Sequence, residues 1–215
     1  HVIVSLIQFT SGGIARAELA RQLGLSRSAI TTIINDLMET GTIRESAKKT
    51  GTSGRPRTLL EITPEAGFVA GIDMGAKHLR IAISNFRAQV LSEKEIPFDI
   101  SKDPNLCIQQ ADELLKELLT EAGLKLTQLE AIGFGVPGPI SSDVGMVIAP
   151  PIMPGWDQFP IRKTLEDMWG LPVSVNNDAE LGALGEWAYG AGRDASDLAY
   201  IKVGTGIGAG LLIDG

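Results

Sequence analysis

Residues 1–41 carry three runs of apolar positions at helical spacing, and breaks that contain glycine separate the runs. This pattern predicts one helix that ends at Ser11-Gly12-Gly13, a second from Ile14 to Leu23, and a third that ends at Gly41. Ser26 directly precedes the third run and is its expected N-cap. The apolar residues at helical spacing in the first run are Val2, Ile3, Leu6, Ile7 and Phe9, and those that form the apolar stripe of the third are Ile30, Ile33, Ile34, Leu37 and Met38. In the second run, Leu19, Ala20 and Leu23 are predicted to face inward.

Two short strands are predicted next, at Thr42–Arg44 and Thr58–Ile62, with a basic loop rich in glycine and serine between them. Two short helices with a tight turn, followed by a basic hairpin, are typical of a winged helix-turn-helix. Its second helix can lie in a DNA major groove, and its wing can follow the phosphate backbone or enter a minor groove. The alternative is a plain three-helix bundle with a solvated polar face. The candidate DNA-binding residues are Ser26, Arg27, Ser28, Thr31 and Thr32 in the helix and Lys48, Lys49, Arg55 and Arg57 in the loop.

From residue 68 onward, three strands in succession are followed by strands that alternate with helices. This order predicts an α/β fold with a mixed sheet covered by helices. The chain therefore divides into a head, residues 1–67, and a body, residues 68–215. The predicted strands are Phe68–Met74, His78–Ser84, Gln89–Pro97, Leu129–Val136, Leu171–Val175, Leu198–Val203 and Ile207–Ile213. The predicted helices are Pro104–Ala122, with Leu106, Ala111, Leu114, Leu115, Leu118 and Leu119 inward, then Ile161–Trp169 and one that follows Asp178.

Polar residues stand where the strand Leu171–Val175 gives way to a helix. Open α/β folds hold their ligands at the carboxyl ends of the strands, so Asn177 and Asp178 are candidate ligand residues. An amide and a carboxylate suit a polyhydroxy ligand, and the carboxylate could take the proton from a sugar hydroxyl. The alternative is that Asp178 only caps the helix.

Glycine turns follow the first strand of the body, at Asp73-Met-Gly75, and join the last two strands, at Gly204-Thr205-Gly206. Paired turns of this kind can cradle phosphates with backbone N–H groups. Hairpins also need glycine for purely conformational reasons, so the turns alone leave both interpretations open.

The net charge of −7 is unevenly distributed. Residues 1–67 hold eight Lys/Arg and six Asp/Glu, whereas residues 68–215 hold eleven and twenty. A mildly basic head on an acidic body is weakly indicative of a polyanionic partner for the head, although chance could also produce it. The single cysteine, Cys107, excludes an intrachain disulfide, fits a reducing compartment such as the cytoplasm, and leaves no Cys-rich metal site. No apolar run approaches a membrane span. Because the chain opens on His1 within an apolar helix, we expect preceding residues to be absent.

Six short motifs together resemble the ROK family of sugar kinases and sugar-responsive repressors, including regulators of the NagC/XylR type. They are Gly71-Ile-Asp-Met-Gly75, Gly135-Val-Pro-Gly138-Pro, Pro154-Gly-Trp-Asp157, Asn177-Asp178-Ala, Ala183-Leu-Gly-Glu186 and Gly204-Thr-Gly-Ile-Gly208. The resemblance implies an actin-like (ribonuclease H-like) body. It also implies that Asp178 occupies the position of the catalytic base, that Gly138, Asn177 and Asp178 contact a sugar, and that Gly206 borders it. The residues that the resemblance implies for phosphate or nucleotide binding are Asp73, Gly75, Lys77, Gly204, Thr205 and Gly206. Family repressors carry a winged helix ahead of this body, whereas the plain kinases lack it.

Two departures from the family pattern bear on function. The kinases usually read Asp-x-Gly-Gly-Thr-Lys in the first turn, whereas here Ala76 adds a Cβ and Lys77 replaces the hydroxyl. Both changes should weaken nucleotide binding. The later sugar and zinc segments and much of the second lobe are also not in this sequence, and the exposed apolar surface this leaves would favour association.

The sequence therefore predicts a sugar-responsive transcriptional regulator, most simply a repressor, that binds operator DNA as a homodimer or homotetramer and takes a sugar or sugar phosphate as effector. The alternatives are an ATP-dependent sugar kinase, with ATP and Mg²⁺, that carries a DNA-binding head, and a binding module without regulation. The identity of the sugar, the operator and the direction of the response are not encoded in recognisable motifs.

Overall fold

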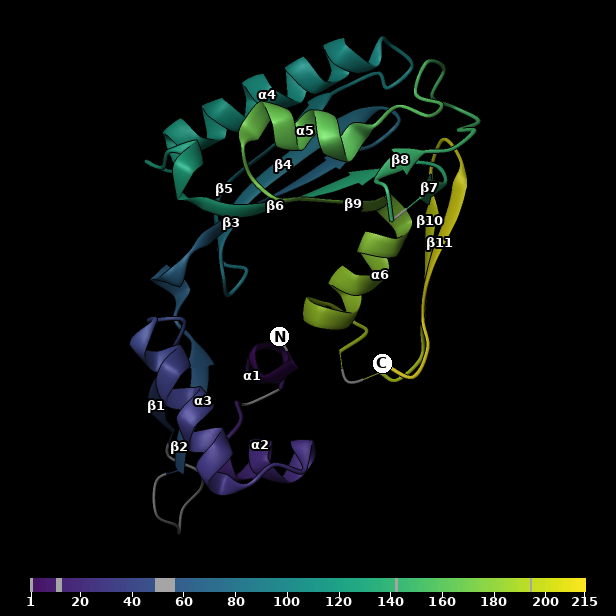
Figure 1. Cartoon of the computed structure of the whole chain (residues 1–215). Coiled ribbons are helices and arrows are strands. Elements are labelled where there is room, and N and C mark those ends of the chain that lie inside the picture. Colours follow the sequence, from purple (N-terminus) through teal and green to yellow (C-terminus); the bar gives the residue numbers. More distant parts are fainter. Residues whose placement is uncertain (1, 11–12, 49–56, 142, 194) are drawn as a thin grey trace. The chain divides into compact units, whose positions relative to one another are not determined.

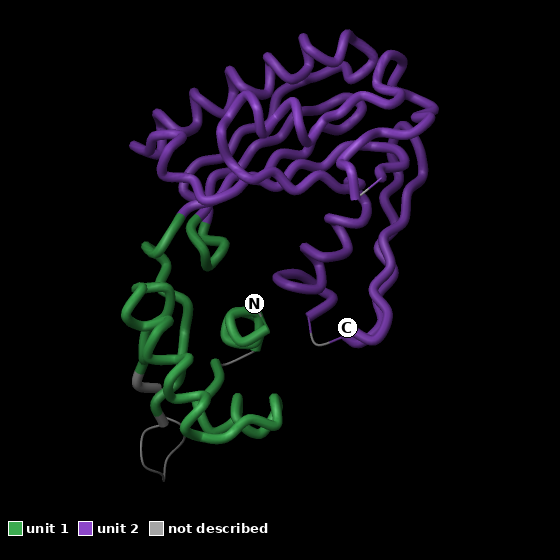
Figure 2. The backbone as a smooth tube through the Cα atoms, viewed as in Figure 1, with its two compact units in different colours: residues 1–67, 85–89 green, residues 68–84, 90–215 purple. Residues whose placement is uncertain are grey.

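The computed structural model describes residues 2–10, 13–48, 57–141, 143–193 and 195–215. It divides into two compact units (Figure 2), one of residues 1–67 with 85–89, and one of residues 68–84 with 90–215. Across the described residues, no helix is both long and apolar enough to cross a membrane.

In the described part of the first unit, three α-helices are followed by a β-hairpin (Figure 1). The helices are α1 (Val2–Phe9), α2 (Arg16–Leu23) and α3 (Arg27–Glu39), and the hairpin pairs β1 (Ile43–Lys48) with β2 (Arg57–Ile62) in antiparallel register. The predicted winged helix-turn-helix fold is therefore confirmed. The buried core of this unit consists of Ile7, Ile14, Leu19, Ala20, Ile30, Ile34, Ile43, Leu60 and Ile62.

The start of the second helix was wrongly placed by the sequence pattern. Ile14 is extended, and its carbonyl accepts a hydrogen bond of 2.8 Å from the Leu60 N–H, which forms an isolated bridge to the hairpin. The helix begins only at Arg16. Ile14 is buried, and an apolar residue suits a buried position in a helix as well as in a bridge, so its apolar character could not distinguish the two.

The second unit is built on a five-stranded sheet in the order β5-β4-β3-β6-β9. The strands are β3 (Phe68–Met74), β4 (His78–Asn85), β5 (Val90–Pro97), β6 (Leu129–Val136) and β9 (Val173–Asn177). β6 pairs in parallel with β3 on one side and with β9 on the other, whereas β4 and β5 pair with each other in antiparallel register. The short elements of this unit are β7 (Ile140–Ser141), β8 (Met146–Val147) and η2 (Leu126–Gln128). A further short element, η1 (Pro64–Ala66), lies at the end of residues 1–67 in the first unit. The predicted mixed sheet is confirmed.

Helices α4 (Pro104–Glu121) and α5 (Ile161–Trp169) cover one face of this sheet, and α6 (Asp178–Tyr189) lies on the other side (Figure 1). The core between sheet and helices includes Trp156, whose side chain is fully buried and whose indole N–H donates to the Ile100 carbonyl at 3.0 Å. The prediction that Leu106 faces this core is wrong, since 58% of the residue is exposed. Cys107 and Ile108 take the buried positions instead.

The hairpin of β10 (Leu198–Val203) and β11 (Ile207–Leu212) packs on α6, and glycines permit the close approach. A Cβ atom at Gly210 would lie 2.3 Å from the Ala179 carbonyl oxygen, so no larger residue fits without movement. The opposite face of the hairpin exposes Ile201, Val203, Ile207 and Leu211. This matches the expected uncovered apolar surface on the last strands.

Candidate functional site

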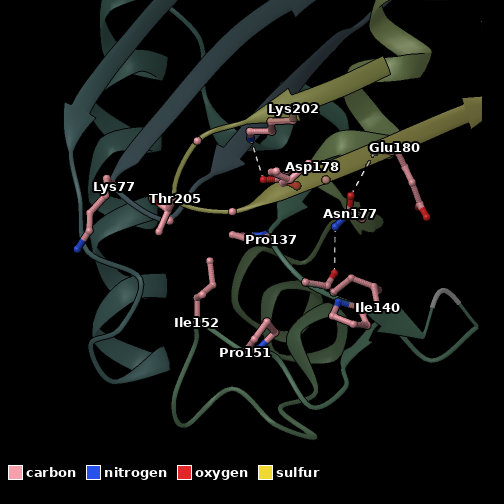
Figure 3. A pocket seen from close by; sticks show the side chains of 18 of the residues that line it. Lys77, Pro137, Ile140, Pro151, Ile152, Asn177, Asp178, Glu180, Lys202 and Thr205 are labelled. Atoms are coloured by element: carbon pink, nitrogen blue, oxygen red, sulfur yellow. Dashed lines mark hydrogen bonds and ion pairs between the residues drawn. The ribbon is translucent and has the colours of Figure 1, made fainter. Parts of the chain in front are cut away.

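A cleft of about 800 Å³ lies at the carboxyl ends of the parallel strands (Figure 3). The turns after β3 and β6 and the start of α6 form one part of its wall, and the β10–β11 hairpin forms another. This is the edge at which open α/β sheets hold ligands. The cleft is lined by Ala76, Lys77, His78, Pro137, Gly138, Pro139, Ile140, Pro151, Ile152, Asn177, Asp178, Glu180, Lys202, Gly204, Thr205, Gly206, Ile207, Gly208 and Ala209.

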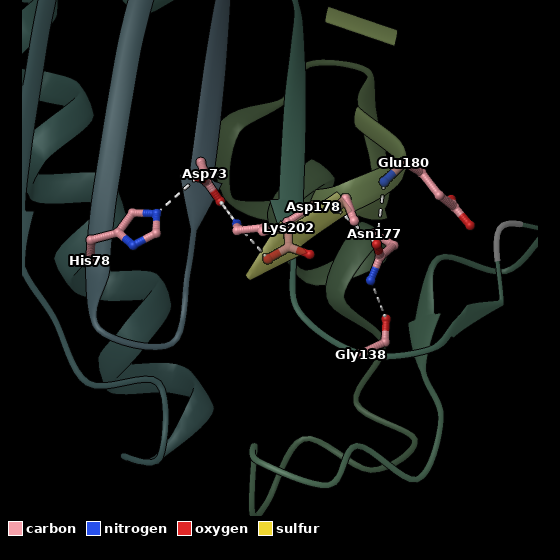
Figure 4. A network of polar contacts seen from close by, with 8 residues as sticks. Asp73, His78, Gly138, Asn177, Asp178, Glu180 and Lys202 are labelled. Atoms are coloured by element: carbon pink, nitrogen blue, oxygen red, sulfur yellow. Dashed lines mark hydrogen bonds and ion pairs between the residues drawn. The ribbon is translucent and has the colours of Figure 1, made fainter. Parts of the chain in front are cut away.

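Asn177 connects two walls of the cleft (Figure 4). Its side-chain oxygen accepts from the N–H groups of Ala179 at 2.9 Å and Glu180 at 3.3 Å, and so caps α6. Its side-chain NH₂ donates to the Gly138 carbonyl oxygen at 3.1 Å. The cap is therefore Asn177, and Asp178, the first residue of α6, does not serve as one.

This outcome follows from where the strand begins and ends along the sequence. The predicted strand Leu171–Val175 instead covers Val173–Asn177, because Val173 is the first residue to pair with β6, opposite Ile132. The two-residue shift places Asn177 at the last strand position, where an N-cap residue has extended backbone angles. Asp178 therefore does not cap the helix, and it lines the cleft.

A chain of polar contacts joins His78, Asp73, Lys202 and Asp178 (Figure 4). Lys202 Nζ lies 2.7 Å from Asp178 Oδ2 and 3.8 Å from Asp73 Oδ1, and the other Asp73 oxygen lies 2.9 Å from His78 Nε2. Burial opposes the charged form of Lys202, but the hydrogen bond to Asp178 and the charges of Asp73 and Asp178 outweigh it, so the pKa of Lys202 is raised. Lys202 is therefore an ammonium ion at neutral pH.

Sequence reasoning did not identify Lys202 or His78 as site residues. A signal for Lys202 existed, because β10 alternates and Lys202 shares the inward-facing set with Leu198 and Tyr200. A lysine in that set requires an acidic partner.

The predicted phosphate-side residues are only partly brought together. Lys77, Gly204, Thr205 and Gly206 line the cleft. Lys77 is exposed, with its ammonium 3.4 Å from Asp99. Asp73 and Gly75 are not among the residues that line the cleft. The carboxylate of Asp73 contacts the His78 ring instead.

The first turn does not fit a nucleotide phosphate in this conformation. A Cβ atom at Gly75 would lie 2.2 Å from a carbon of the His78 imidazole, so the ring fills the space over this glycine. Backbone approach to a phosphate requires that space. Within the described chain, no group of three or more His, Cys, Asp or Glu side chains could hold a metal ion.

The candidate DNA-binding residues of α3 are all exposed: Ser26, Arg27, Ser28, Thr31 and Thr32. Ser26 Oγ accepts from the Ala29 N–H at 3.1 Å, as the expected N-cap. The hydroxyls of Thr31 and Thr32 donate to the carbonyl oxygens one turn earlier, at Arg27 and Ser28. The hydroxyl oxygens of these exposed threonines can still accept hydrogen bonds from a partner.

The predicted wing residues lie mostly beyond what the structure describes. Lys49 and Arg55 fall outside the described residues. Lys48 and Arg57 pair with each other at the end of the hairpin next to residues 49–56, and their side chains are not described.

Comparison with known proteins agrees with both units. Residues 69–215 match the ROK family, and residues 5–44 match a winged helix-turn-helix DNA-binding family. The chain belongs to the ROK family. The xylose repressor of Caldicellulosiruptor bescii is 30% identical over 201 residues, which are 94% of this chain and 50% of that protein. The chain thus spans about half the length of the curated relatives it matches.

Two solved structures, one of a transcriptional regulator and one of a kinase, match different shares of this chain. A ROK family transcriptional regulator, described as a homologue of the Escherichia coli Mlc protein, is 25% identical with a TM-score of 0.77, covering 99% of this chain and 53% of that one. The ROK hexokinase of Thermus thermophilus is 32% identical with a TM-score of 0.59, covering 68% of this chain and 47% of that one. The transcriptional regulator therefore matches nearly the whole chain, whereas the kinase matches about two thirds of it.

Proposed function

We propose that the full-length protein is a sugar-responsive transcriptional repressor, with operator DNA and a sugar as its two ligands. The observation that carries this proposal is the presence of a winged helix-turn-helix and a ROK body with a polar cleft in one chain. Relatives that match nearly the whole chain include a xylose repressor and a ROK transcriptional regulator.

On the DNA side, the exposed face of α3 carries the groups that read a major groove. Arg27 has no ion-pair partner among the described residues, so its guanidinium is available to a phosphate or a guanine edge. The threonine methyl groups and hydroxyl oxygens add short contacts. Helix-turn-helix proteins bind two half-sites as two-fold dimers, so we propose a homodimer or a homotetramer built from dimers.

On the sugar side, Asn177, Asp178 and the Gly138 turn converge in the cleft. Asp178 Oδ2 is taken by Lys202, whereas Oδ1 has no hydrogen-bond partner among the described residues and can accept from a sugar hydroxyl. Apolar surface from Pro137, Ile140 and Ile152 can pack against a sugar ring. Xylose is the first sugar to test because a relative is named for it. We place the protein in the cytoplasm, where both ligands are found.

The test begins with selection of a duplex from a random DNA pool by the full-length protein, followed by anisotropy titrations with and without xylose, glucose and other monosaccharides. One sugar should change the DNA affinity by about 5- to 150-fold, and DNA should change the sugar affinity by the same factor. Asp178→Asn should lose the response. Selective DNA binding that no sugar alters would remove the responsive part, and failure to select any duplex would remove the regulator.

A second candidate function is an ATP-dependent sugar kinase with ATP and Mg²⁺ as cofactors. The likeness to a ROK hexokinase and the carboxylate at Asp178 favour it. The His78 ring over Gly75 and the Lys202 contact to Asp178 argue against it. A coupled ADP-release assay on the full-length protein with hexoses and pentoses decides, and turnover that Asp178→Asn abolishes would establish the kinase.

A further inference from the structure

The contacts of Lys202 are unusual for a lysine on a sheet edge. Its side chain is 30% exposed and that of Asp178 only 11%, so the contact between them is largely withdrawn from water. The 2.7 Å hydrogen bond is a charge-assisted one. The same ammonium faces Asp73 at 3.8 Å, within the range of an ion pair.

Without this ammonium, two carboxylates would face one another across a partly buried space. Asp73 Oδ1 is buried and has no hydrogen-bond partner among the residues that the structure describes, so the nearby positive charge of Lys202 compensates its charge. Like charges this close disfavour the ionised state of both groups. Two carboxylates that face one point are also the ligands that Mg²⁺ or Mn²⁺ usually takes.

The other basic side chains that line the cleft, Lys77 and His78, do not compete for this position. Lys77 points toward Asp99, and the His78 ring contacts the far oxygen of Asp73. Lys202 alone among the described residues contacts both carboxylates, and it does so from β10, the strand that the Gly204–Gly206 turn follows.

We propose that Lys202 is a built-in cation that occupies the point between Asp73 and Asp178 where a divalent metal would otherwise bind. It orients Asp178 as a fixed hydrogen-bond acceptor, so the cleft takes a sugar without a nucleotide or a metal. Lys202 acts through Asp178 and is a positioning residue. The part of this inference that concerns the sugar rests on the proposed function; the part that concerns the cation does not.

Lys202→Met in the full-length protein tests this, since it removes the charge and keeps the length of the side chain. Lys202→Gln serves as a second variant in case the first does not fold, Lys202→Arg retains the charge, and Lys163→Met removes a matched charge from an exposed lysine on α5. Manganese binding, measured by the loss of the free Mn²⁺ signal in electron paramagnetic resonance, is the primary readout.

Lys202→Met or Lys202→Gln should bind one more Mn²⁺ per chain than the wild type, with a dissociation constant on the order of 10⁻⁴–10⁻³ M. Adding Asp73→Asn should abolish the extra site, and Lys202→Arg and Lys163→Met should show none. By calorimetry, wild-type sugar affinity should not respond to Mg²⁺, ATP or Mn²⁺. The affinity of Lys202→Met should fall about tenfold or more without metal and recover with Mn²⁺.

An unchanged Mn²⁺ count in both folded neutral variants would overturn the inference, as would wild-type sugar binding that requires Mg²⁺ and ATP. If the extra Mn²⁺ site appears but the wild type binds no sugar, the cation role stands and the proposed function fails. If the wild type binds sugar and neither variant gains a site, the proposed function stands and the inference fails.

Discussion

Asn177 offers the sharpest test of how the cleft is held together, because one side chain both caps α6 and ties it to the Gly138 turn. Asn177→Ala removes all three hydrogen bonds of that side chain. The loss of an N-cap costs about 0.5–2 kcal/mol, and the loss of the bond to the Gly138 carbonyl costs about 0.5–1.5 kcal/mol. We expect a total of about 1–3.5 kcal/mol.

This loss should be localised, so the assay should be as well. Hydrogen–deuterium exchange measured by mass spectrometry on peptides that cover Asp178–Tyr189 reports the opening of α6. Since each 1.4 kcal/mol is a factor of ten, amides at the start of α6 should exchange about 5- to 300-fold faster in the alanine variant. Sugar affinity should fall as well, because Asp178 is the first residue of the loosened helix.

Asn177→Asp is the matched control. Its carboxylate keeps the acceptor for the Ala179 and Glu180 N–H groups and adds a favourable charge at a helix N-terminus. It lacks the donor to the Gly138 carbonyl. Exchange in α6 should therefore stay within about threefold of the wild type, while the Pro137–Gly138 turn exchanges faster. Unchanged α6 exchange in Asn177→Ala, or equal acceleration in both variants, would refute the reasoning.

Three further predictions concern other parts of the molecule. Arg27→Ala should weaken DNA binding and reduce the slope of log affinity against log salt by about one, as measured by anisotropy, whereas Arg80→Ala in the body should not; equal slopes would exclude a phosphate contact. Gly210→Ala should force β11 away from α6 and cost about 1–3 kcal/mol in urea denaturation, whereas Gly71→Ala, with open space around it, should cost less; equal midpoints would contradict this packing. Burial raises the pKa of the Cys107 thiol to about 11, so the native state retains a proton that the unfolded chain loses above about pH 8.5. The contribution of the Cys107 thiol to the free energy of unfolding should therefore fall as the pH rises from about 8.5 to about 11. At pH 8, iodoacetamide should label native Cys107 far more slowly than it labels the unfolded protein; equal rates would show that the thiol is accessible.

The site illustrates why a family motif does not by itself establish an activity. Asp178 and Asn177 stand where the sequence motif places them, yet Lys202, 24 residues further along, engages the carboxylate. The turn after β3 shows the same point. The space that a phosphate would need over Gly75 is filled by the His78 ring, whereas the sequence pointed to the Ala76 Cβ as the obstacle.

The sequence alone was sufficient for the winged helix and the mixed sheet. These follow from periodicity, glycine turns and capping residues, which are local along the chain. Only the tertiary structure decided the roles of Ile14, Asn177 and Lys202. Each depends on a partner distant in sequence or on strand register: Ile14 on Leu60, Asn177 on pairing with β6, and Lys202 on the approach of β10 to α6. A local pattern shows that such a residue is buried or polar, but the packing of distant segments determines which group it contacts.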